Sequence, residues 1–236
     1  MAKLFGAVAP GCWLVLPDEA RARELEQLLM VLERQFYSAN IALDLFERSY
    51  AAARVNSGTN SEERNYRWNA DVSRKSQILE ALERKSALDP RDITARHRLQ
   101  LQAEAQFKRE AWEQEHLTGL LWLEPTLIHA RAFLHALALF ERLLGILAKD
   151  ANAPVQLAAW YSRFQEAFPD VRGVRDSVQH MDERSQWKAH GKEIDTNLLL
   201  HDTLSSSATG LPNYIATMAN GKPGALEVSA RSMDVL

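Results

Sequence analysis

The sequence predicts a mainly α-helical protein, a bundle of about six helices with a long projecting helical hairpin and a C-terminal β-hairpin. Three observations support this fold class. Ten glycines and eight prolines are few for 236 residues, so tight turns between many short strands are not expected. Alanine, leucine, glutamate and arginine, which favour helices, are common. Apolar residues also recur at three- and four-residue steps over most of the chain.

The first predicted helix runs from about Glu19 to Arg54, and Asp18 just before it is a suitable N-cap. Its apolar side chains recur at helical spacing and are Leu25, Leu28, Leu29, Leu32, Phe36 and Ile41. The polar stretch at residues 56–60 predicts the end of this helix.

Two long helices of mixed charge follow, from about Ser61 to Ala87 and from about Arg91 to Trp122. The first of them has a thin apolar stripe, made of Tyr66, Val72, Leu79 and Leu82. Between Glu62 and Glu115 the chain carries 11 basic and 11 acidic residues. A neutral pair of helices with interspersed charges is typical of a solvated hairpin. We therefore expect residues 61–122 to project from the bundle.

The fourth predicted helix, from about Pro125 to Ala148, is apolar nearly all round and should lie at the centre of the bundle. A fifth helix opens at Pro154, and its expected buried face consists of Leu157, Trp160, Tyr161 and Phe164. A short sixth helix follows Asp170, which would cap it, and carries the apolar residues Val171, Val174, Val178 and Met181. These helices complete a bundle over residues 1–192.

Residues 193–236 form a C-terminal extension of different texture. Ser205, Ser206 and Ser207 are typical of a loop. Two short β-prone runs, residues 214–218 and 225–229, are joined by the turn-forming stretch 220–224, which predicts a β-hairpin.

Composition excludes several classes of protein. A net charge of −3 excludes a strongly basic coat for nucleic acid, and the single cysteine, Cys12, excludes an intramolecular disulfide and favours a reducing, cytoplasmic setting. Six polar or ionisable side chains between Leu120 and Leu147 argue against a membrane span. His129 and His135 are six residues apart and do not share a helix face, so neither a metal site nor a cofactor is expected.

The stretch from Val171 to Lys192 stands apart, because it carries five basic residues against three acidic ones together with two histidines and Trp187. Four Arg–His pairs in the chain have four to six intervening residues, namely Arg91/His97, Arg109/His116, Arg175/His180 and Arg184/His190. The pair Arg175/His180 is preferred, because its surroundings are cationic and could hold a phosphate.

The segment Arg175-Asp176-x3-His180 resembles the signature of the HEPN superfamily, an arginine, often followed by a polar residue, with four to six residues between it and a histidine. The resemblance covers about fifteen residues and the helical outline of residues 18–190. It implies metal-independent RNA cleavage in which the ribose 2′-OH attacks the adjacent phosphorus. Arg175 would hold the phosphate and His180 would move protons. Asp176 would orient Arg175 or His180. The surrounding RNA contacts would come from Arg172, His190 and Lys192.

The resemblance also implies a homodimer that brings two such motifs into one cleft, and a toxin or defence component held in check by an inhibitory protein partner. A second interpretation is a non-catalytic helical module that binds a protein or a nucleotide. Its docking surfaces would be the charged hairpin, from about Ser61 to Glu115, and the terminal β-hairpin, which can add to the edge of a partner's sheet. An enzyme needs Arg175 and His180 exposed together, whereas a fully buried His180 would exclude it.

Overall fold

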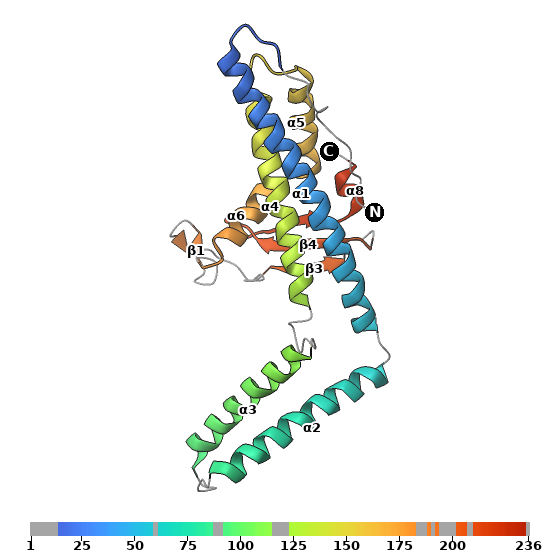
Figure 1. Ribbon diagram of the computed structural model, residues 1–236, viewed down its shortest axis with the longest axis vertical. Helices are drawn as coiled ribbons and strands as arrows, with labels where there is room; N and C mark the ends of the chain where they lie inside the picture. The colour runs from blue at the N-terminus through green and yellow to red at the C-terminus, as the bar shows by residue number, and fades with distance from the viewer. Residues whose placement is uncertain are drawn as a thin grey trace. The chain divides into compact units, whose positions relative to one another are not determined.

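The computed structural model describes residues 14–58, 61–86, 92–114, 123–182, 188–189, 192–193, 202–206 and 210–234. The chain divides into two compact units. We call them the bundle unit, residues Met1–Tyr50 and Pro125–Leu236, and the hairpin unit, residues Ala51–Glu124. The protein is mainly helical with a small antiparallel sheet near the C-terminus, as the sequence predicts (Figure 1).

Four helices of the bundle unit pack around one apolar core. They are α1 (Glu19–Gly58), whose last residues belong to the hairpin unit, α4 (Glu124–Leu147), α5 (Gln156–Ala167) and α6 (Val171–Gln179). Helix α4 contributes more residues to this core than any other described element, and they include Phe133, Leu134, Leu137, Phe140, Leu144 and Leu147. This confirms the central position predicted from its apolar circumference. Asp18 caps α1 as predicted, because its carboxylate accepts hydrogen bonds from the backbone N–H groups of Ala20 and Arg21.

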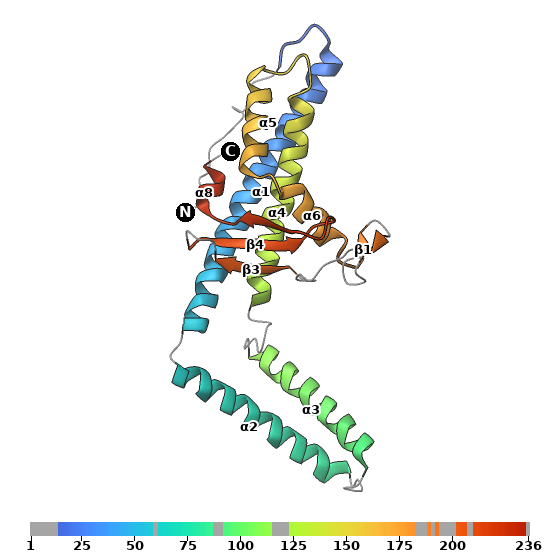
Figure 2. The ribbon, with the colours of Figure 1, turned by 180° about the vertical axis from the view of Figure 1, so that it is seen from behind.

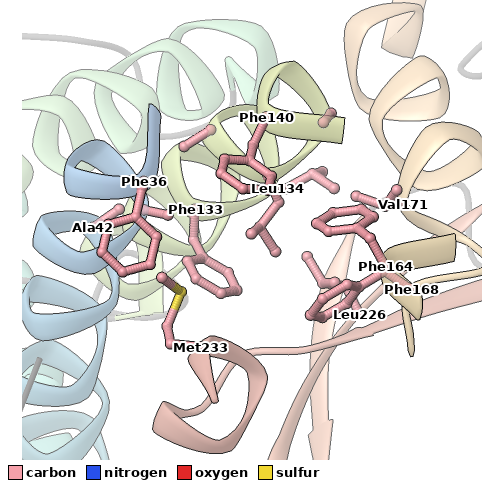
Figure 3. Close-up of a cluster of buried hydrophobic side chains, with 14 of the residues drawn as sticks. Phe36, Ala42, Phe133, Leu134, Phe140, Phe164, Phe168, Val171, Leu226 and Met233 are labelled. Carbon is pink, nitrogen blue, oxygen red and sulfur yellow. The ribbon is translucent and has the colours of Figure 1, made fainter. Parts of the chain in front are cut away.

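Aromatic rings join the elements of this core. The Phe164 ring lies 5.8 Å from the Phe140 ring and 4.8 Å from the Phe168 ring, centroid to centroid. Met233, from the short C-terminal helix α8 (Ala230–Met233), reaches the side chains of Phe36 and Phe133 (Figure 3). The last described residues of the chain therefore complete the core.

Two predicted core positions are wrong. Ile41 is 59% exposed, because the five-residue step from Phe36 leaves the buried stripe, which continues through Ala39, Leu43 and Phe46 instead. Trp160 is 55% exposed. It lies beside the buried face of α5 and lines an apolar pocket of about 410 Å³ with residues of α1 and of the loop before α5.

A three-stranded antiparallel sheet follows the helices, in the order β3 (Thr203–Ser206), β4 (Pro212–Thr217) and β5 (Pro223–Glu227). Strands β4 and β5 are the predicted hairpin. The loop expected at Ser205 and Ser206 is wrong, because these residues pair with Asn213 and Pro212. Small polar residues carry a weak strand signal, and the strand is formed by pairing with β4 and by packing of Leu204 against the core. Two further residue pairs, β1 (Lys188–Ala189) and β2 (Lys192–Glu193), form a short ladder.

The hairpin unit consists mainly of α2 (Ser61–Ser86) and α3 (Ile93–Glu113), which pack against each other. Their shared apolar contact is small and is built from Ile78, Leu79, Leu82, Ala103 and Phe107. Tyr66 and Val72, predicted in the apolar stripe, are exposed, because on an ideal helix Tyr66 lies about 120° from Ile78.

Asp92 caps α3 by accepting a hydrogen bond from the backbone N–H of Ala95 at 2.9 Å. The predicted end of α3 at Trp122 and Cys12 both lie outside the described residues. Among the helices that the structure describes, none has the length and apolar character that crossing a lipid bilayer requires.

Candidate functional site

Helix α6 carries the predicted site and lies directly against the sheet, in contact with β4 and β5 (Figure 2). Glycines permit this approach. A Cβ atom on Gly224 would lie 2.8 Å from Cγ2 of Val174, and one on Gly173 would lie 2.5 Å from Sδ of Met218. Both distances are shorter than van der Waals contact, so larger residues would push α6 away from the sheet.

The two faces of α6 differ in character. Val171, Val174 and Ser177 are buried. On an ideal helix the opposite face spans about 140° and carries Arg172, Arg175, Asp176, Gln179 and His180. Four of the six predicted site residues therefore share the outer face of one short helix.

Asp170 precedes α6 but does not cap it as predicted, since its side chain makes no capping hydrogen bond. Its carboxylate instead accepts a hydrogen bond from the backbone N–H of Ala225 in β5, at 3.2 Å. This contact adds a polar tie between the start of α6 and the sheet.

Arg172, predicted to contact RNA, is bound to a buried carboxylate of α4. Its Nε donates to Oε2 of Glu141 at 2.7 Å, and its Nη2 donates to Oε1 at 2.6 Å. Tyr161 of α5 donates a further hydrogen bond to Oε1 at 3.0 Å. The hydrogen bond to Glu141 raises the pKa of Arg172. Burial, and then the hydrogen bond to Glu141, raise the pKa of Tyr161.

Glu141 was not predicted as a site residue, although its sequence carries a signal. It is an acidic residue on the inner face of an otherwise apolar helix, and only 2% of it is exposed. A charge at such a position needs an ionic partner, because burying it alone is costly. Its partner, Arg172, lies 31 residues further along the chain and could not be chosen from the sequence.

Arg175 and Asp176 are in direct contact. Nε of Arg175 donates to Oδ1 of Asp176 at 2.9 Å, and Nη2 contacts the same oxygen. The Arg175 side chain is 24% exposed and that of Asp176 is 42% exposed, so solvent reaches both. The contact joins Asp176 to Arg175, and the orienting role of Asp176 stays a prediction.

His180 is exposed and occupies the C-cap of α6. Its backbone N–H donates to the carbonyl oxygen of Asp176 at 3.0 Å, and its φ and ψ of −108° and 39° leave the helical path. A fully buried His180 would exclude the enzyme interpretation, and His180 is exposed. Arg175 and His180 lie five residues apart, about 140° on an ideal helix.

The side chains of two predicted RNA contacts, His190 and Lys192, are not described by the structure. His190 lies outside the described residues. Lys192 is placed only as a backbone position of β2, paired with Ala189. Within the described ranges, no three His, Cys, Asp or Glu side chains gather in a way that could hold a metal ion.

A second buried ionic cluster joins α4 to the sheet and was also not predicted. Arg131 donates to both oxygens of Asp202, at 2.5 and 2.9 Å, and the Tyr214 hydroxyl donates to Oδ2. Burial acts to raise the pKa of Asp202, but the hydrogen bonds from Arg131 and Tyr214 outweigh it and hold the pKa below its usual value. Burial, and then the bond to Asp202, raise the pKa of Tyr214. This cluster fixes the sheet against which α6 packs.

The chain has no significant match to any family model, curated protein or solved structure. The residues of α6 and their surroundings therefore carry the functional proposal for this chain.

Proposed function

We propose that this protein is a metal-independent endoribonuclease that cleaves RNA at the outer face of α6. The observation that carries the proposal is the exposed His180 at the end of a helix whose Arg175 is held by Asp176. An exposed imidazole can exchange protons near neutral pH, and a fixed guanidinium can bind a phosphate. Both groups belong to the segment that resembles the HEPN signature.

In the proposed reaction the 2′-oxygen of a ribose attacks the adjacent phosphorus and forms the new P–O bond. His180 in its neutral form accepts the proton that the 2′-OH loses. The P–O5′ bond breaks, the 5′-oxygen takes up a proton, and the products carry a 2′,3′-cyclic phosphate and a 5′-OH. The reaction requires RNA, because DNA lacks the 2′-OH.

Arg175 would stabilise the charge that grows on the phosphate oxygens. Asp176 contacts the Nε and Nη2 positions of the guanidinium, and Nη1 carries two further N–H bonds that can be directed at a phosphate. We assign Arg172 to anchoring α6, because Glu141 and Tyr161 engage its guanidinium. The homodimer, in which a second copy supplies another acid–base group, and an inhibitory protein partner belong to this proposal and follow from the resemblance alone.

The test is cleavage of total RNA by the purified protein in EDTA, compared with His180→Ala and with a matched control, His135→Ala, which removes an exposed histidine of α4. We expect cyclic-phosphate ends from the wild type and the control. We expect H180A to cleave about 10²–10⁴-fold more slowly, the usual contribution of a general acid–base group.

Two results would overturn the proposal. If the wild-type protein leaves RNA intact, the non-catalytic module becomes the better description. Equal cleavage by the wild type and H180A would mean that the acid–base group is a different residue, or that a contaminating nuclease is present.

A further inference from the structure

The outer face of α3 in the hairpin unit is exposed and unusual in composition. Helix α3 buries Leu99, Ala103, Phe107 and Ala111. On the opposite side Trp112 is 69% exposed and Leu101 is 59% exposed. A large ring held this far into solvent on a regular helix is available for contact with a ligand.

Charges on α3 are separated by face, although the hairpin as a whole is neutral. On an ideal helix one arc of about 100° contains Arg98, Leu101, Lys108, Arg109 and Trp112, and no acidic residue. We call these five residues the outer face of α3. The sequence count of equal positive and negative charges could not show this separation, because it ignores direction.

Two acidic residues flank this face, Glu104 on the side of Lys108 and Glu113, four residues after Arg109, on the other side. Glu104 contacts Lys75 of α2 at 2.8 Å and Lys108 at 3.4 Å, and Glu110 contacts Arg74 at 2.8 Å. Within the residues that the structure describes, Arg98 and Arg109 form no ion pair. Of the three cations of the outer face, Lys108 is therefore paired with Glu104, and the two arginines remain for a ligand.

We infer that the outer face of α3 binds single-stranded RNA, as a second RNA-contacting surface of the chain. Arg98 and Arg109 lie about 16 Å apart along the helix, at about 1.5 Å per residue, so they fit an extended polyanion better than one phosphate group. Trp112, three residues after Arg109 and about 60° from it around the helix, offers a ring on which an unpaired base can stack. The choice of RNA rests on the function proposed above.

The composition of the face argues against a membrane surface as the occupant. A helix that lies in a bilayer interface needs a broad apolar face with cations at its edges. Here Leu101 and Trp112 are the large apolar residues of the arc, and cations are interspersed with them. Stacking also favours single strands over duplexes, since the bases of a duplex are already stacked on one another.

The test measures binding of the full chain to a fluorescent single-stranded 2′-O-methyl RNA by anisotropy. This probe has no free 2′-OH and resists the proposed cleavage, so binding is measured independently of catalysis. We expect Trp112→Ala to weaken binding about tenfold, as loss of one stacked base does. Arg98→Gln with Arg109→Gln should weaken it further and lower the slope of log affinity against log salt by about 1.4, or about 0.7 for each lost cation.

Matched controls lie on α2. Trp68→Ala removes a tryptophan that is 70% exposed, and Arg84→Gln with Lys85→Gln removes the same charge as the double variant of α3. We expect both controls to bind like the wild type. Far-UV circular dichroism checks that every variant keeps its helices.

Several outcomes would overturn the inference. These are no binding of the probe, equal losses in the α2 controls, or binding to phosphatidylserine-containing vesicles in place of RNA. The experiments distinguish failure of the catalytic proposal from failure of the binding inference. Probe binding without RNA cleavage would overturn the catalytic proposal alone, and cleavage by W112A with unchanged probe affinity would overturn this inference alone.

Discussion

Two acidic side chains of the bundle unit are buried against arginines, whereas the two carboxylates that tie the helices of the hairpin unit together are partly exposed. The side chains of Glu141 and Asp202 are 3% and 4% exposed. Their arginine partners are 31 and 71 residues away in the sequence. In the hairpin unit, Glu104 is 40% exposed and Glu110 is 25% exposed. Buried pairs fix the positions of whole elements, whereas surface pairs bind weakly and exchange readily with solvent.

This difference is consistent with the separate roles that the two proposals give to the two units. In the bundle unit, the clusters around Glu141 and Asp202 tie α6 and the sheet to α4, so the candidate catalytic helix is held in place. The hairpin unit has only a small apolar contact between its helices, and its surface pairs leave Arg98 and Arg109 of α3 available. The first arrangement suits chemistry that needs fixed geometry, and the second suits capture of a flexible polymer.

The largest expected effect on stability comes from Asp202→Asn. The substitution removes the negative charge that binds Arg131 and Tyr214 in a buried setting. We expect it to destabilise the bundle unit by about 3 kcal/mol, as breaking one side of a buried ion pair usually does. Urea unfolding followed by circular dichroism measures this loss. Asp44→Asn, which breaks the more exposed pair with Arg48, is the control and should have little effect.

The loss of stability caused by Asp202→Asn should also depend on pH. The folded-state pKa of Asp202 is lowered from its ordinary value of 3.8, so the carboxylate adds stability above that pH and loses it as the pH falls through the folded-state pKa. The stability difference between the wild type and D202N should therefore be full at pH 7 and shrink below about pH 4. A difference that stayed constant down to pH 2 would show that folding does not lower the pKa of Asp202.

Much of the fold could be predicted from the sequence, because local patterns determine it. Three features depend only on residues that are close together in the sequence. They are the cap at Asp18, the apolar circumference of α4 and the turn at residues 220–224. Strand β3 was missed, since Thr203–Ser206 becomes a strand only by pairing with β4. Ile41 shows the same limit, because an apolar residue at helical spacing need not have anything packed against it.

The candidate site could be predicted only in part. Arg175, Asp176 and His180 belong to one short segment, and on α6 and its C-cap they span an arc of about 140°. Arg172 belongs to the same segment, yet its partner Glu141 is on another helix. A pattern of neighbouring residues cannot show which of two arginines is bound to a buried acid.

An intermediate effect is expected when the tie between Arg172 and Glu141 is removed. Glu141→Gln should destabilise the bundle unit by about 2 kcal/mol, because it weakens hydrogen bonds to a charged group. The effect should be smaller than that of D202N, since Arg172 is 58% exposed and Arg131 is 32% exposed. A double-mutant cycle with Arg172→Met should give a coupling of about 1–2 kcal/mol. Independent losses would contradict the anchoring role of Arg172.

The smallest effect is expected in the hairpin unit, from Glu104→Gln. This substitution removes a surface carboxylate bound by Lys75 and Lys108, so unfolding should change by less than about 1 kcal/mol, and high salt should remove most of the difference. We expect the substitution to increase the affinity for RNA, because Lys108 loses its acidic partner and the outer face of α3 becomes more cationic. We expect E104Q to bind the 2′-O-methyl RNA slightly more tightly at low salt, by anisotropy. Weaker binding would show that Glu104 positions Lys108 for the ligand, which would make this surface pair a fixed element like those of the bundle unit.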